Sequence, residues 1–96
     1  MSSFVLSPRA RRDLDGIWEH IAADNLDAAD RWLTEAEKAL HLLSEWPNIG
    51  HTRKDLTDKR VLFWPIGRYL IIYRGDRRPI QVVRVLSAYR DVPRLL

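Results

Sequence analysis

The side chains in this sequence that could take part in chemistry are three histidines and a large set of arginines. His20, His41 and His51 ordinarily titrate nearest to neutral pH, so a general acid–base reaction would use them first. Their spacing from Asp and Glu matches no metal-binding motif, and a histidine on a helix more often packs or faces solvent than binds a metal. We therefore expect no metal site, no cofactor and no catalytic residue.

The basic residues are concentrated in the second half of the chain. Residues 1–50 carry five Arg and Lys against nine Asp and Glu, a net charge of −4. Residues 51–96 carry eleven against four, a net charge of +7, which makes the whole chain +3. Arginine pairs with both carboxylates and phosphates, so this asymmetry predicts an acidic partner, either a nucleic acid or a polypeptide. A solvated basic face without a partner is the alternative.

One short stretch, "RVLSAYRD", contains arginines in two different settings. Arg84 interrupts an apolar strand, where burial of its charge would demand a partner. Tyr89, Arg90 and Asp91 follow the strand near the end of the sequence. This triplet could be a catalytic site, a contact surface or only a charged strand end.

Length and composition predict one small domain that covers residues 1–96. The absence of cysteine excludes disulfides and thiolate chemistry and fits a reducing compartment. We find no apolar run long enough for a signal peptide or a membrane span, so we expect a cytoplasmic protein. The sequence also has no Gly-x-Ser-x-Gly motif and no glycine-rich phosphate loop.

Two amphipathic helices are predicted in the first half, joined tightly as an antiparallel hairpin. The first begins at the Ser7-Pro8 cap and ends at Asp24-Asn25, and Asn25 caps the second, which stops at Trp46-Pro47. A short strand, "FVLS", precedes them. Three further strands follow, "RVLFWPI", "RYLIIYR" and "PIQVVRVLSA", joined by tight turns. Pro65 places the first of the three at an edge of the sheet or breaks it there.

The predicted fold is α+β, with the order β-α-α-β-β-β and a helix hairpin packed on one face of a mainly antiparallel sheet. The strands "YLIIY" and "IQVVRVL" are apolar on both faces, so the face opposite the helices needs a cover. Either the final "VPRLL" folds over it or a partner chain does, and we favour the partner.

In this order and spacing, "FVLSPRARRDLDGIWEHIAADN", "AADRWLTEAEKALHLLSEWPNIG", "IGRYLIIYR" and "VVRVLSAYRD" resemble the ParE branch of the RelE/ParE toxin superfamily. The resemblance covers nearly the whole chain. It implies a non-enzymatic inhibitor of DNA gyrase that a cognate antitoxin neutralises in a hetero-oligomer. That antitoxin would be a ribbon-helix-helix or similar DNA-binding protein with an acidic C-terminal segment, and it alone would contact DNA.

The RelE-like branch instead cleaves messenger RNA on the ribosome, with arginines, lysines and often a late tyrosine. Leu70 stands where those toxins tend to carry an arginine, and "DVPRLL" has no late tyrosine or histidine, although Arg90 matches an arginine of both branches. An endoribonuclease and a non-toxic interaction module therefore remain as alternatives. The expected target-binding residues are Tyr89, Arg90, Asp91 and Arg94. The expected antitoxin-binding residues are Arg60, Arg68, Tyr69, Tyr73 and Arg84.

Overall fold

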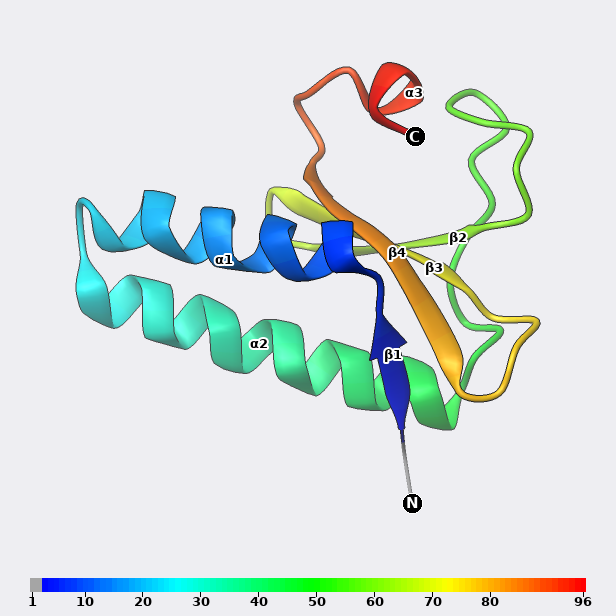
Figure 1. The fold of residues 1–96 in the computed structure, drawn as a ribbon, viewed down its shortest axis with the longest axis horizontal. Helices are drawn as coiled ribbons and strands as arrows, with labels where there is room; N and C mark the ends of the chain where they lie inside the picture. The colour runs from blue at the N-terminus through cyan, green and yellow to red at the C-terminus, as the bar shows by residue number, and fades with distance from the viewer. Residues whose placement is uncertain (1–2) are drawn as a thin grey trace.

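The computed structural model describes residues 3–96, which form one strand, two long helices, three more strands and a short final helix (Figure 1). These elements are β1 (Phe4–Leu6), α1 (Pro8–Ala22), α2 (Leu26–Glu45), β2 (Leu62–Ile66), β3 (Tyr69–Arg74), β4 (Ile80–Ser87) and α3 (Val92–Leu95). The predicted α+β class and the β-α-α-β-β-β order are confirmed. Helix α3 was not predicted.

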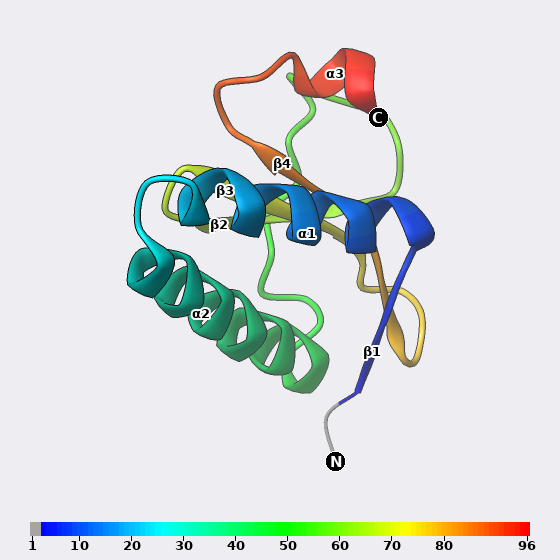
Figure 2. The same ribbon diagram turned by 60° about the vertical axis from the view of Figure 1, so that its left-hand side comes forward.

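Both long helices begin at the caps expected from the sequence. The Ser7 side chain accepts a hydrogen bond from the Ala10 N–H at 3.0 Å, and the Asn25 side chain accepts one from the Ala28 N–H at 3.0 Å. Pro8 occupies the first turn of α1, where its missing N–H has no helical partner to lose. The two helices lie side by side and cover one face of the sheet (Figure 2).

The sheet has the strand order β1-β4-β3-β2 and is antiparallel except where β1 pairs with β4. Pro65 lies in the edge strand β2, as predicted. Proline has no N–H to donate, so it fits a strand that has a neighbour on one side only. Gly67 and Arg68 form the two-residue turn between β2 and β3. Gly67 has a φ of 61°, which the first position of such a turn requires.

Strand β4 contains a β-bulge. The bulge interrupts the alternation of side chains between the two faces of the sheet, so that apolar residues on both sides of it face the helices. Ile72 pairs with Arg84 and Tyr73 pairs with Val82, so Val83 is an extra residue between the two pairs. Val82 and Val85 can then both join the helix-side core. That core also contains Ala10, Ala39, Leu40, Leu43, Ile71, Tyr73 and Ile80.

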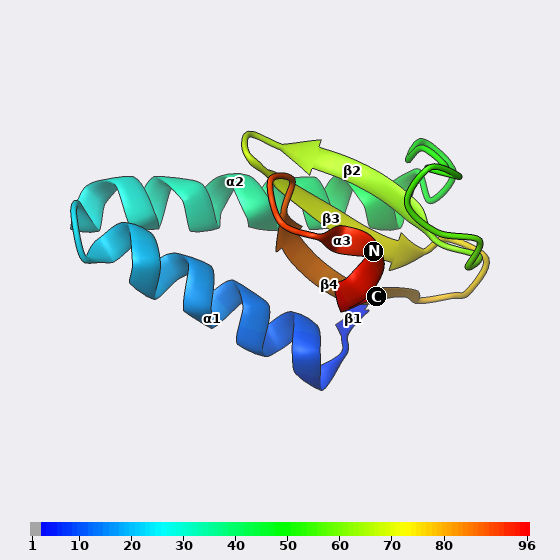
Figure 3. The ribbon, with the colours of Figure 1, turned by 90° about the horizontal axis from the view of Figure 1, so that it is seen from above.

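The opposite face of the sheet is covered by the chain itself. Val92 of α3 is buried against Ile72 and Leu86, and α3 lies over β3 and β4 (Figure 3). The loop before β2 adds Leu56 and Val61 to the same cluster. Our preference for a partner chain on this face was therefore wrong, because two segments without predicted secondary structure supply the apolar side chains. Within residues 3–96, no helix is both long and apolar enough to cross a bilayer.

Candidate functional site

Arg84 and Asp13 form an ion pair that joins three elements of the fold. The Arg84 guanidinium donates from Nε to Asp13 Oδ2 at 2.7 Å and from Nη2 to Oδ1 at 3.0 Å. Its Nη1 donates to the Leu95 carbonyl at 2.8 Å, and the Val85 N–H donates to Asp13 Oδ2 at 3.0 Å. We call these four residues the Asp13–Arg84 junction. It ties α1, β4 and α3 together.

The buried charge of Arg84 needs a partner, and the junction supplies that partner from within the same chain. The two side chains are only 14% and 15% exposed. The bonds to Asp13 raise the pKa of the Arg84 guanidinium, because they favour its charged form. The assignment of Arg84 to antitoxin binding is therefore corrected: its guanidinium is already engaged by α1 and α3.

Three of the expected target-binding residues lie on the turn between β4 and α3. Tyr89 is 82% exposed, and Arg90 and Asp91 are exposed beside it. The turn is held by Ser87, whose carbonyl accepts from the Arg90 N–H at 3.2 Å and whose Oγ accepts from the Tyr89 N–H at 3.2 Å. The fourth residue, Arg94, is exposed on α3. The turn therefore lies between β4 and α3, and the Asp13–Arg84 junction holds these two elements together.

A furrow runs between α1 and this C-terminal segment. It consists of three hollows of 470, 510 and 380 Å³, each of which is lined by Arg12. Its basic lining residues are Arg9, Arg12, His20, Lys59, Arg84, Arg90 and Arg94, and Asp13 is the acidic residue among the lining residues. We call it the basic furrow. Arg90 and Arg94 therefore share one surface through Arg12, although they lie on different elements.

The wall that α1 contributes to the basic furrow was missed from the sequence. From the sequence we singled out none of Arg9, Arg12 and Gly16 for this site, and we considered His20 only as a catalytic or metal-binding candidate. These four residues recur at intervals of three and four, so they form a second stripe along α1. That spacing is the signal that could have identified the wall.

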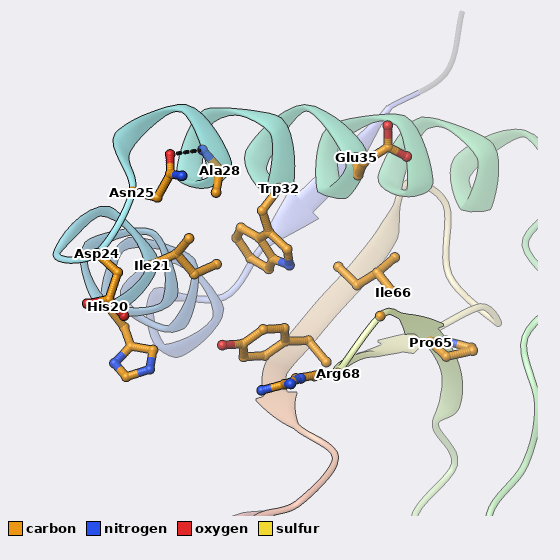
Figure 4. A pocket seen from close by; sticks show the side chains of 12 residues that line it. His20, Ile21, Asp24, Asn25, Ala28, Trp32, Glu35, Pro65, Ile66 and Arg68 are labelled. Carbon is orange, nitrogen blue, oxygen red and sulfur yellow. Dashed lines mark hydrogen bonds between the residues drawn. The ribbon is translucent and has the colours of Figure 1, made fainter.

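A separate hollow, of 720 Å³, lies between the tip of the helix hairpin and the turn between β2 and β3 (Figure 4). Its apolar lining residues are Ile21, Ala28, Trp32, Pro65, Ile66, Gly67 and Tyr69, and its polar ones are His20, Asp24, Asn25, Glu35 and Arg68. We call it the hairpin groove. The Trp32 ring meets the Tyr69 ring edge to face, with centroids 5.3 Å apart.

The hairpin groove brings together only part of the expected antitoxin-binding set. Arg68 and Tyr69 line it, whereas Arg60 is exposed on the loop before β2 and is not a lining residue. Tyr73 is fully buried; its hydroxyl donates to the Pro47 carbonyl at 2.8 Å and accepts from the Gly50 N–H at 2.9 Å. The prediction for Tyr73 is wrong, because the side chain cannot reach a partner.

The three histidines have different surroundings. His41 packs edge to face on Phe4 at 5.4 Å, and His51 stacks on Trp64 at 6.1 Å, so both have packing partners. His20 lines the basic furrow and also the hairpin groove. In the part of the chain that the structure describes, no group of three His, Asp or Glu side chains could hold a metal ion.

Comparison with known proteins identifies relatives over nearly the full length of the chain. A family model described as the ParE toxin of the type II toxin-antitoxin system, parDE, matches residues 4–92. The chain is 31% identical over 88 residues to the protein named "Putative toxin Y4kP" of Sinorhizobium fredii, which covers 92% of this chain and 90% of that protein. The chromosomal ParDE TA system from P. aeruginosa contains a chain of similar fold, with a TM-score of 0.73 and 20% identity over 91% of this chain and 96% of that one.

Proposed function

The chain belongs to the ParE toxins of type II toxin-antitoxin systems, and we propose that it inhibits DNA gyrase by binding, without enzymatic activity, and that a cognate antitoxin neutralises it. The observation that carries the proposal is the exposed Tyr89–Asp91 turn on the rigid Asp13–Arg84 junction. Tyrosine and arginine are residue types that dominate binding energy at protein interfaces. A turn that is fixed before contact loses little conformational entropy on binding.

We further propose that the antitoxin fills the hairpin groove. Its lining is mostly apolar, which suits apolar side chains of an incoming segment. Arg68 lies at the turn that borders the groove, where it can pair with a carboxylate of an acidic C-terminal segment. None of Tyr89, Arg90 and Asp91 lines the groove, but His20 and Tyr69 line both the groove and the hollow that Arg90 lines, so the antitoxin and the target would use adjacent surfaces.

A gyrase supercoiling assay with purified protein tests the target. We expect Arg90→Ala to lose inhibition, whereas Arg77→Ala, which removes an exposed arginine from the turn between β3 and β4, should inhibit like the original chain. Calorimetry on the same variants should show antitoxin affinity changed by less than about tenfold, or about 1.4 kcal/mol. Undiminished inhibition by Arg90→Ala would overturn the target assignment. Loss of both activities with an unchanged circular dichroism spectrum would place the turn in the antitoxin site.

A ribosome-dependent endoribonuclease is the second candidate, and one observation favours it. His20 lines the same hollow as Arg12 and Arg90, so a titratable group lies beside two cations that could hold a phosphate. Pulse labelling after induction in cells separates the two functions. Gyrase inhibition stops replication first, whereas the endoribonuclease stops translation and leaves cleaved transcripts.

A further inference from the structure

The charges of the basic furrow are almost all of one sign. Arg84 is neutralised by Asp13, and Lys59 donates to the Leu96 main-chain oxygen. Arg9, Arg12, Arg90 and Arg94 form no ion pair and no side-chain hydrogen bond within residues 3–96. Like charges gathered along a narrow hollow repel one another and raise the local concentration of anions. The furrow therefore favours an anionic ligand with several charges in a row.

Gly16 lines the furrow in the middle of α1, and the fold itself does not require glycine there. A Cβ at this position would meet no atom within 4 Å, and its φ is not in the left-handed region. Glycine in a helix interior is less stable than alanine. Because Gly16 has no side chain, only its backbone lines the furrow at this position, and a ligand can approach the helix backbone there.

The four arginines without an ion-pair partner within residues 3–96 favour a nucleic acid over an acidic peptide as the ligand of the furrow. The hollow of 380 Å³ is lined by Arg9, Arg12, Asp13, Arg84 and Arg94, with Leu95 as its apolar residue. Bound peptides normally bury apolar anchors, and this hollow offers only Leu95, whereas the other two hollows add apolar lining residues such as Ile17, Val83 and Leu96. Tyr89 lines none of the three hollows, but it is 82% exposed next to Arg90, which lines the hollow of 470 Å³, so a base can stack on it there.

We propose that the basic furrow binds a single strand of nucleic acid, with its phosphates along Arg9, Arg12, Arg94 and Arg90 and a base stacked on Tyr89. The three hollows, of 380 to 510 Å³, share the lining residue Arg12, so one strand can contact all of them. Binding of this kind is independent of sequence and weakens with salt. This interaction goes beyond the proposed contacts with gyrase and the antitoxin, both of which are proteins, and it does not depend on them. It requires no cleavage of the strand, which separates it from the endoribonuclease considered for the same hollow.

Fluorescence anisotropy of the purified full chain with a labelled oligothymidylate of roughly 16 nucleotides tests the proposal. If each of the four arginines meets one phosphate, the slope of log affinity against log salt should be about −2.8. Arg12→Gln and Arg94→Gln should each weaken binding severalfold and reduce the slope by about 0.7. Arg77→Gln is the matched control, since it removes one exposed positive charge outside the furrow, and it should leave affinity and slope unchanged.

Gly16→Ala supplies a readout that misfolding cannot imitate. The substitution should raise the melting temperature, because alanine favours the helix, and weaken binding of the oligonucleotide, because its methyl group enters the furrow. Equal loss of affinity in Arg77→Gln and Arg12→Gln would overturn the proposal. So would displacement of the oligonucleotide by polyglutamate as effectively as by unlabelled strand, or tighter binding of a duplex than of the single strand.

Discussion

Tyr73 links the turn after α2 to the sheet through two hydrogen bonds made by one hydroxyl. The Pro47 carbonyl and the Gly50 N–H are both its partners, and a side chain on Gly50 would collide with the tyrosine ring. The short "PNIG" turn is therefore shaped around Tyr73. Its role is to hold the end of α2 against β3, and this explains why a residue expected at an interface lies in the core.

Tyr73 should make the fold sensitive to alkaline pH. Burial raises the pKa of its phenol, while the Gly50 N–H bond opposes this effect to a smaller degree. The folded state therefore favours the neutral phenol. Its contribution is complete below the ordinary pKa of about 10 and is lost as the pH rises through the higher folded value.

Urea unfolding of Tyr73→Phe between pH 8 and pH 11 checks this. At pH 8 the variant should be less stable by about 1–3 kcal/mol, because two buried hydrogen-bonding groups lose their partner. Above pH 10 the difference between variant and original chain should shrink. Tyr89→Phe, at an exposed position, should show neither effect, and a difference that stays constant up to pH 11 would exclude Tyr73 as the titrating group.

At the scale of elements, the Asp13–Arg84 junction decides how α1, β4 and α3 meet. Asp13→Ala would remove the acceptor of Arg84 Nε, of Arg84 Nη2 and of the Val85 N–H, and would leave Arg84 only its bond to the Leu95 carbonyl. Because hydrogen bonds to charged groups contribute more than neutral ones, we expect a loss of about 1.5–3 kcal/mol in unfolding free energy. The double variant Asp13→Leu with Arg84→Leu should recover part of the loss, since it removes both charges. A single variant as stable as the original would mean that the junction contributes nothing.

Helix α3 should contribute to the stability of the fold, in addition to carrying Arg94. Val92 is fully buried against β3 and β4, so removal of residues 92–96 would expose apolar surface on both strands. Val92 alone should contribute about 1.5 kcal/mol or more, and Leu95 and Leu96 add to this. Chemical denaturation measures the change, with Arg94→Ala as the control that removes only an exposed side chain. Loss of toxicity on truncation would thus reflect a weakened fold in addition to a lost contact.

At the scale of the whole molecule, the two faces of the sheet are both covered, and the hairpin groove is a mostly apolar hollow that stays open among the described residues. We expect the cognate antitoxin to raise the melting temperature through that groove. A ligand that binds only the folded state at one hundred times its Kd stabilises by about 2.7 kcal/mol. Differential scanning fluorimetry should show the increase with intact antitoxin and lose it when the acidic segment is deleted. Equal melting temperatures in the two cases would contradict the groove assignment.

Features that depend on near neighbours could be predicted from the sequence alone. The caps at Ser7 and Asn25, the turn at Gly67 and the edge position of Pro65 follow from interactions within a few residues, and the order of elements follows from the spacing of apolar side chains. The exposed position of Arg90 could also be predicted, because it follows the last strand.

Features that join distant segments were decided only by the tertiary structure. Arg84 is bound by Asp13, 71 residues away, and no local pattern specifies that pairing. The bulge at Val83 changes which residues face the helices, and the burial of Tyr73 depends on a turn more than twenty residues before it. The basic furrow exists because α3 folds back beside α1, which brings Arg94 to Arg12. A charge that faces water on an isolated helix becomes part of a shared surface only when another segment packs next to it.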